Sequence, residues 1–92
     1  MKRQKTIDSF KEKVLTIVSS IKKGSTFSYK QVAKRAGNPH AARAVGSILK
    51  KNYDPTIPCH RVIHSDGSIG DYNRGKRQKM ILLKKEGAIT YP

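Results

Sequence analysis

The chain contains a single cysteine, Cys59, which stands between Pro58 and His60 in the stretch TIPCHRVIHSDG. Pro58 fixes its own backbone and pushes Ile57 towards an extended conformation, so we expect Cys59 on a rigid turn. A free thiol has a pKa of about 8.5, so nucleophilic chemistry at neutral pH requires a nearby base or positive charge. His60 and Arg61 follow immediately. Cys59 is therefore a candidate nucleophile, and the alternative is a buried thiol without a chemical role.

His60 is the nearest candidate for the base. Neighbouring side chains of an extended segment point to opposite faces, so we expect His60 to reach the sulfur through a bridging water. A base also needs an acceptor that orients it, as in a catalytic triad. The chain has only six acidic residues, and Glu86, at the end of the last predicted helix, is the candidate. The alternative for Glu86 is a surface ion pair with nearby lysines.

Three helices are predicted ahead of the cysteine. Ser9 and Glu12 form a capping-box pattern at the start of the first helix, which is expected to end at Gly24. The apolar residues of this helix recur at helical spacing: Ile7, Phe10, Val14, Ile17, Val18 and Ile21.

The second and third helices are predicted from cap residues. Ser28 and Gln31 form another capping-box pattern, and Gly37 closes the short helix that follows. Asn38 is then expected to cap a third helix that has Pro39 at its first position.

These elements predict one domain, residues 1–92, that is mainly α-helical with a small β wing. A helix-turn-helix is expected over about 28–51, with an ordinary helical hairpin as the alternative. We expect residues 52–63 to form the active-site loop around the candidate nucleophile Cys59. Residues 62–75, with two short extended pieces around an SDGS turn, form a wing and lid. A basic helix over 76–87 completes this winged helix-turn-helix domain.

The charge of the chain is strongly positive. Twenty Lys and Arg residues stand against six Asp and Glu, for a formal net charge of +14. Such a surface favours a polyanionic partner, and nucleic acid is the leading candidate over a merely basic surface, a ribosome-associated protein or a membrane-surface protein. With four Tyr and two Phe, the chain is poor in aromatic residues for stacking on single strands, so duplex DNA is favoured.

The composition argues against several other classes of protein. One cysteine excludes an internal disulfide, and the histidines lack the paired spacing of a zinc site, so neither a metal nor another cofactor is expected. His40 and His64 are expected to be solvated. A signal peptide and a long apolar run are missing, so we expect an intracellular protein without a membrane partner, cytoplasmic or nucleoid-associated in a prokaryote and nuclear in a eukaryote.

Several motifs together resemble a known family. The stretches FSYKQVA, GNPHAARAVGSILKKN and PCHRVIHSDGSIGDYNRG are similar in order and spacing to the C-terminal domain of the O6-alkylguanine-DNA alkyltransferases, which repair DNA by direct reversal. The resemblance covers roughly residues 10–87. It implies a winged helix-turn-helix that binds the minor groove and flips the damaged guanine out of the duplex.

The resemblance also implies a reaction. The sulfur of Cys59 would attack the alkyl carbon on O6, and each molecule would act once because the S-alkylcysteine is not reversed. His60 and Glu86 match a water-mediated relay that forms the thiolate. Tyr29 matches a tyrosine whose hydroxyl faces guanine N3 and stabilises the leaving guanine.

Other positions are implied to hold DNA and the flipped base. Arg43 matches the arginine that takes the place of the flipped guanine, and Asn52 matches a hinge asparagine. The carbonyls of Cys59 and Val62 would accept from the guanine amino group, and the backbone N–H of Asn73 would face O6. The full set expected at the DNA or in the pocket is Tyr29, Ala42, Arg43, Gly46, Lys50, Cys59, Arg61, Val62, Tyr72 and Asn73.

The sequence also departs from the family. It lacks the additional N-terminal domain of most relatives, so we expect a minimal single-domain version that is monomeric and could cluster on DNA. The stretch 52–59 is one residue shorter than in well-known members. Asp71, Asn73 and Arg74 replace small residues of the lid, which predicts a narrower pocket and a preference for methyl over benzyl.

Two other functions remain as alternatives. The alkyltransferase-like proteins share this compact domain and recognise damage without repairing it, but they replace the cysteine, usually with tryptophan, whereas Cys59 is present here. A winged-helix transcription regulator would have no use for the Pro-Cys-His-Arg turn. The thiol therefore favours the enzyme.

Overall fold

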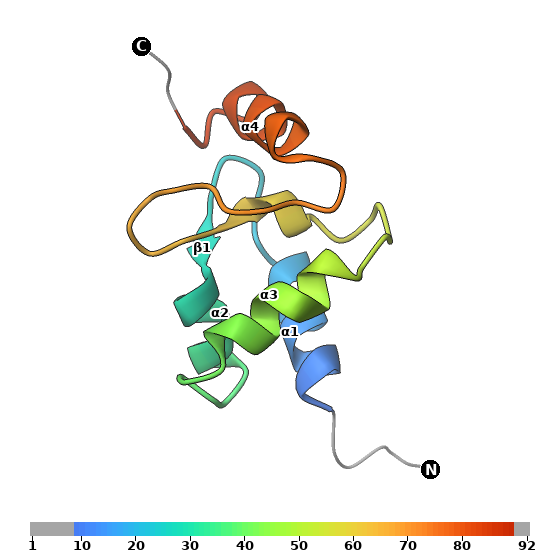
Figure 1. Ribbon diagram of the computed structural model, residues 1–92, viewed down its shortest axis with the longest axis vertical. Helices are drawn as coiled ribbons and strands as arrows, with labels where there is room; N and C mark the ends of the chain where they lie inside the picture. Colours follow the sequence, from blue (N-terminus) through green and yellow to red (C-terminus); the bar gives the residue numbers. More distant parts are fainter. Residues whose placement is uncertain (1–8, 90–92) are drawn as a thin grey trace.

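The computed structural model describes residues 9–89 (Figure 1). The elements in chain order are α1 (Phe10–Ser19), β1 (Phe27–Ser28), α2 (Tyr29–Arg35), α3 (Ala42–Lys50), a 3₁₀ turn η1 (Cys59–Arg61), β2 (Val62–Ile63) and α4 (Lys76–Lys85). The prediction of a mainly helical fold with a small β element is confirmed. Ile7 and the basic N-terminal segment lie outside the described residues.

Helix α1 begins where the capping box predicts and ends earlier than expected. Ser9 Oγ accepts a hydrogen bond from the Glu12 amide, and the Glu12 carboxylate accepts one from the Ser9 amide. The helix ends at Ser19 rather than near Gly24. The hydroxyls of Ser19 and Ser20 donate to the carbonyls of Leu15 and Ile17, and such local bonds compete with a continuing helix.

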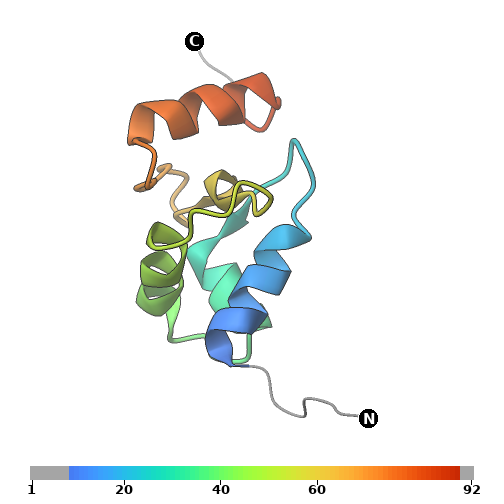
Figure 2. The same cartoon turned by 90° about the vertical axis from the view of Figure 1, so that its right-hand side faces the viewer.

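Helix α3 crosses α1 and α2 and closes the core (Figures 1 and 2). Its start was predicted wrongly, because it begins at Ala42 instead of Pro39. The Asn38 side chain accepts a hydrogen bond from the His40 amide, which makes a turn in place of a helix cap. The fully buried residues of the three helices form one apolar cluster with β2: Val14, Val18, Val32, Ala33, Val45 and Val62.

The two strands pair with each other in parallel, Phe27 opposite Val62 and Ser28 opposite Ile63. The two short extended pieces expected around the SDGS turn do not pair with each other, because only the first of them is a strand and its partner comes from before α2. The SDGS turn is present, since the His64 amide donates to the Ser68 carbonyl at 2.9 Å. Residues 64–75 otherwise run as a loop past α3.

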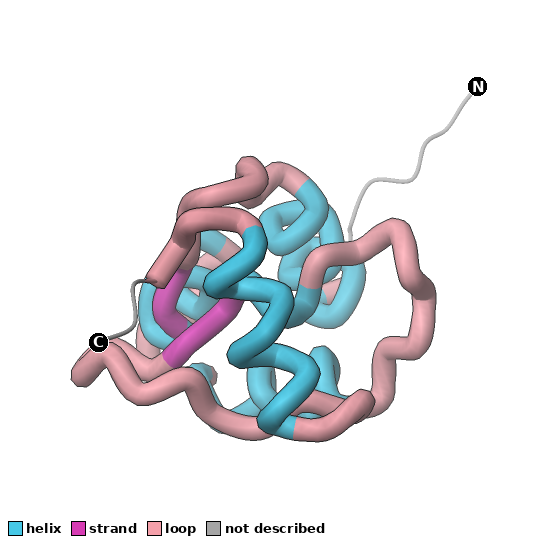
Figure 3. The backbone as a smooth tube through the Cα atoms, turned by 90° about the horizontal axis from the view of Figure 1, so that it is seen from above, coloured by secondary structure: helices cyan, strands magenta, loops and turns pink. Residues whose placement is uncertain are grey.

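Helix α4 lies at the end of the molecule remote from the start of α1 and packs against η1 (Figures 2 and 3). It ends at Lys85, and Gly87, with φ of +77°, reverses the chain. The Gly87 and Ala88 amides donate to the carbonyls of Lys84 and Leu83, which is the glycine-terminated end predicted from the sequence. Among residues 9–89, no helix has the length and apolar content needed to cross a membrane.

Candidate active site

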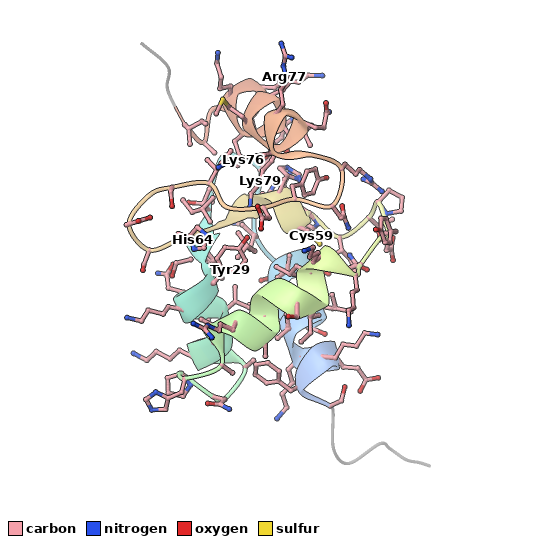
Figure 4. All side chains as sticks on the ribbon, in the orientation of Figure 1. Tyr29, Cys59, His64, Lys76, Arg77 and Lys79 are labelled. Atoms are coloured by element: carbon pink, nitrogen blue, oxygen red, sulfur yellow. The ribbon has the colours of Figure 1, made fainter. Side chains whose placement is uncertain are left out.

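A cavity of about 460 Å³ opens between α3, the start of α2, η1 and the loop after β2 (Figure 4). Most of the residues predicted for the pocket or for DNA line it, whereas His60, Glu86, Asn52, Arg61 and Val62 do not. Its lining residues are Tyr29, Ala42, Arg43, Gly46, Ser47, Leu49, Lys50, Cys59, His64, Asp71, Tyr72 and Asn73. A cleft of this size is in the range of small-ligand sites.

Cys59 lies on the wall of this cavity at the start of η1, with 7% of its surface exposed. The turn is held by the Cys59 amide, which donates to the Ile57 carbonyl at 2.8 Å. Asn52 Nδ2 donates to Cys59 Sγ at 3.2 Å. Burial raises the pKa of the Cys59 thiol, against the opposing effects of the Asn52 hydrogen bond and of the charges of Lys79 and Arg74. The resting thiol is therefore protonated at neutral pH.

The His60 side chain contacts Glu86, at the end of α4. Its Nε2 lies 2.9 Å from Glu86 Oε2, and its ring meets Tyr72 edge-on with 6.3 Å between centroids. The sequence predicted opposite faces from an extended segment, but Cys59 and His60 are consecutive residues of a 3₁₀ turn. Among the described residues no direct hydrogen bond joins His60 to Sγ.

The Glu86 carboxylate accepts hydrogen bonds from two side chains of η1, those of His60 and Arg61. Arg61 Nε and one terminal nitrogen each donate to Glu86 at 2.9 Å, and the other terminal nitrogen donates to the Ile21 carbonyl at 2.8 Å. The Arg61 hydrogen bonds, followed by that of His60, lower the pKa of Glu86 to about 2. Glu86 is thus an ionised acceptor that orients His60.

The position of Arg61 favours a structural role. Its guanidinium joins the chain after α1 to the end of α4, its side chain is only 16% exposed, and it does not line the cavity. A DNA contact by Arg61, as expected from the sequence, would require breaking a bidentate pair with Glu86. Charge-assisted pairs of this geometry are among the strongest hydrogen bonds in proteins.

Tyr29 stands on the opposite wall and is held by a residue that the sequence did not suggest. Lys79 is completely buried, and its Nζ donates to Tyr29 Oη at 3.2 Å and to the Asp71 carbonyl at 3.1 Å. Burial, ahead of the charges of Asp71 and Cys59, raises the pKa of Tyr29. Burial is also the main reason why the pKa of Lys79 falls to about 8.

Helix α3 has small residues, Ala42 and Gly46, on the face that lines the cavity. Gly46 leaves room beside Tyr29, since a Cβ built there would lie 3.9 Å from its ring. Arg43 and Lys50 are exposed at the rim, and Leu49 is buried behind it. The positions of Ala42, Arg43, Gly46 and Lys50 at the cavity are compatible with the DNA contacts expected of them.

The lid is tied to the end of α3. Asn73 Nδ2 donates to the Asn52 carbonyl, and an Arg74 terminal nitrogen donates to the Tyr53 carbonyl at 3.1 Å. Asn52 thus contacts both the thiol and the lid. Asn73 and Arg74 therefore anchor the lid through their side chains, which a small residue at either position could not do.

Two residues of the site were missed from the sequence. His64 is an exposed loop residue, as expected, but it also lines the cavity and lies against Tyr29 with 4.9 Å between ring centroids. Lys79 was not singled out because it is one of several lysines in α4. Its spacing to Leu83 and Glu86, four and then three residues, places all three on one helix face, and this was the available signal. Among residues 9–89, no group of His, Cys, Asp and Glu could hold a metal ion.

Comparison with known proteins identifies the fold family. Residues 9–88 match the model of the 6-O-methylguanine DNA methyltransferase DNA-binding domain. The chain belongs to this family. It is 50% identical over 86 residues to the methylated-DNA–protein-cysteine methyltransferase of Mus musculus, covering 90% of this chain and 41% of that relative. The chain therefore spans less than half the length of this family member.

The similar solved structures include complexes with DNA. Mycobacterium tuberculosis OGT in complex with DNA is 36% identical, with a TM-score of 0.81 over 94% of this chain and 51% of that one. Schizosaccharomyces pombe Atl1, in complex with damaged DNA containing O6-carboxymethylguanine, is 34% identical, with a TM-score of 0.82 over 95% of this chain and 83% of that one. The chain is a DNA-binding domain of a DNA repair family.

Proposed function

We propose that this protein repairs O6-alkylguanine in duplex DNA by transferring the alkyl group to Cys59. The observation that carries the proposal is the position of Cys59 Sγ, which lies on the wall of a cavity opposite Tyr29 and accepts a hydrogen bond from Asn52. A flipped base entering past α3 would meet the thiol and a phenol in one cavity. No such arrangement is required of a protein that only recognises DNA.

The thiol must lose its proton as the reaction proceeds. Because burial raises its pKa, a base is needed, and His60, oriented by ionised Glu86, is the available one. Among the described residues no hydrogen bond joins these two side chains, so the proton would pass through one water between Sγ and the imidazole. The Asn52 hydrogen bond then stabilises the thiolate.

The transfer itself is an in-line displacement. A bond forms between Cys59 Sγ and the alkyl carbon, the bond from that carbon to O6 breaks, and the electron pair leaves with the guanine. Tyr29 Oη, with Lys79 behind it, would donate to guanine N3 and stabilise this anion. The proton removed from the thiol balances the one that guanine takes up, so no co-substrate is consumed.

Duplex DNA is the proposed partner. The two relatives in complex with DNA share this fold at TM-scores above 0.8, and the net charge of +14 favours a polyanion. Helix α3 would enter the minor groove as the second helix of the helix-turn-helix, and Arg43, exposed at the rim, would fill the gap left by the flipped nucleotide. Monomeric action is expected, because one chain carries all the proposed groups.

The test uses a duplex with one O6-methylguanine and measures the intact mass of the protein. We expect a stoichiometric gain of one methylene on the peptide that contains Cys59, and no gain in Cys59→Ser. Tight, lesion-selective binding without a mass change would refute the transfer.

That result would leave the second candidate, a damage-recognition module that does not react. The likeness to Atl1 over most of the length of that protein favours this candidate, and Cys59 argues against it.

A further inference from the structure

His64 lies in the cavity wall but has no part in the reaction proposed above. It stands at the start of the turn after β2, and the bonds of its own backbone with Gly67 and Ser68 fix this turn. Its ring packs against Tyr29 at 46° between planes. Among the described residues, neither ring nitrogen has a hydrogen-bonding partner. The imidazole is thus held in position with its polar atoms available.

Gly70 is what brings the two rings together. It has a φ of +74°, and a Cβ built on it would lie 3.0 Å from both His64 Nε2 and Tyr29 Oη. The imidazole and the phenol therefore flank the same point of the lid backbone. A residue with a side chain at position 70 would push at least one of them away. The absence of a side chain at Gly70 therefore fixes the place of His64 Nε2 as well as that of Tyr29 Oη.

The charged groups at the rim of the cavity indicate what the imidazole of His64 could bind. A flipped base stays attached to its sugar, so its flanking phosphates must remain at the rim through which it entered. On the α3 side, the exposed lining residues include the cations Arg43 and Lys50; on the lid side, they are His64 and Asp71. Asp71 would repel a phosphate. Within the lining, His64 is the side chain of the lid side able to carry positive charge.

We propose that protonated His64 binds a phosphate next to the flipped nucleotide and so strengthens capture of damaged DNA in mildly acidic conditions. The proposal rests on the proposed function only in requiring that a nucleotide enter this cavity. It assigns His64 a role in binding and none in the transfer step.

Other ionisable groups lie around His64 or in the same cavity, and their effects on the pH dependence of binding must be distinguished from that of His64. They are Tyr29 on α2, Arg43 and Lys50 on α3, Cys59 on η1, Asp66 and Asp71 on the loop, and Lys79 on α4. Lys79, with its pKa of about 8, stays mostly protonated if measurements end near neutral pH. All of these groups, and His40 and His60, are shared by variants that differ only at position 64.

The experiment compares His64, His64→Gln and His64→Arg, each in a Cys59→Ser background so that binding is not followed by reaction. Dissociation constants for an O6-methylguanine duplex are measured at about pH 5.5 and about pH 7.2, on either side of a typical imidazole titration, over a series of salt concentrations. At the lower pH we expect His64→Gln to bind about tenfold more weakly than the parent, with a salt slope about one unit smaller. Near pH 7 that difference should shrink, and His64→Arg should bind tightly at both values.

Transfer from a free O6-alkylguanine base, which has no phosphate, provides the second measurement in proteins that retain Cys59. We expect His64→Gln to react with the free base within about twofold of the parent rate. Slower free-base transfer with unchanged DNA affinity would overturn the proposal and make His64 a support for Tyr29. An equal salt slope for His64 and His64→Gln at the lower pH would also overturn it. If the parent transferred no alkyl group at all, the proposed function would fail while the binding comparison still decided the role of His64.

Discussion

Replacing Glu86 by Gln would test whether the buried cluster of Glu86, Arg61 and His60 stabilises the fold. The Glu86 side chain is 9% exposed and accepts hydrogen bonds from both partners. Gln keeps the size and one acceptor oxygen but removes the charge, so a guanidinium that is only 16% exposed would face a neutral amide. Removing one partner of such a buried pair costs about 3 kcal/mol or more.

The pH dependence gives an independent magnitude. Arg61, and then His60, lower the pKa of Glu86 from its usual 4.5 to about 2. Because the folded state binds this proton more weakly than the unfolded state, the stability from Glu86 is fully present above the unfolded pKa. It is lost as the pH falls from about 4.5 through about 2. A shift of this size corresponds to roughly 3 kcal/mol, a large share of a typical unfolding free energy of about 5–15 kcal/mol.

The assay is urea unfolding followed by circular dichroism, at about pH 7 and at steps down to about pH 2. Near neutral pH we expect the free energy of unfolding of the parent to exceed that of Glu86→Gln by about 3 kcal/mol. This difference should disappear as the pH is lowered. Glu12→Gln is the matched control, since Glu12 accepts an exposed hydrogen bond in the capping box that Gln can also make. A gap that is below about 1 kcal/mol near neutral pH, or that does not change with pH, would refute the reasoning.

Three further predictions concern Lys79, Gly70 and the lid. Burial lowers the pKa of Lys79 from 10.5 to about 8. In urea unfolding, the free energy of unfolding of the parent relative to that of Lys79→Met should therefore rise by up to about 3 kcal/mol between about pH 8 and 10.5. A difference that does not change with pH would contradict the burial of this charge. Gly70→Ala should destabilise the fold by about 1–2 kcal/mol. It should also slow alkyl transfer, measured by protein mass, because its Cβ would crowd the hydroxyl of Tyr29; unchanged rates would argue against that crowding. The parent should transfer methyl faster than benzyl, and Asn73→Ser with Arg74→Gly should narrow that ratio in timed transfer assays, because both lid anchors are removed; equal or faster benzyl transfer by the parent would contradict the first part.

The elements set by neighbouring residues were predictable from the sequence. Both capping boxes form as the Ser-x-x-Glu and Ser-x-x-Gln patterns indicate, because they join residues only three apart. The rigid turn at Cys59 follows from Pro58 for the same local reason. The start of α3 was misplaced because Asn38 can make either a cap or a turn, and local sequence does not decide between them.

The errors in the β element have a different origin. Val62 could pair within its own loop or with a distant segment, and alternation of residues suits both. In the structure it pairs with Phe27 and enters the core made by α1, α2 and α3. Burial of Val62 against three helices is a tertiary effect that no pattern within residues 62–75 expresses.

In the candidate site, helix α4 positions two groups of the proposed chemistry. Lys79 and Glu86 lie seven residues apart, which is about two turns and roughly 10 Å along the axis of α4. Completely buried Leu83 lies between them on the same face. One end of that face reaches Tyr29, and the other reaches His60 and Arg61. The groups proposed to take a proton from the thiol and to stabilise the leaving base are therefore both oriented by α4, and Gly87 ends the helix just beyond Glu86. A one-residue shift in the register of α4 would rotate both charges by about 100° away from their partners, so the position of this helix governs both halves of the proposed chemistry.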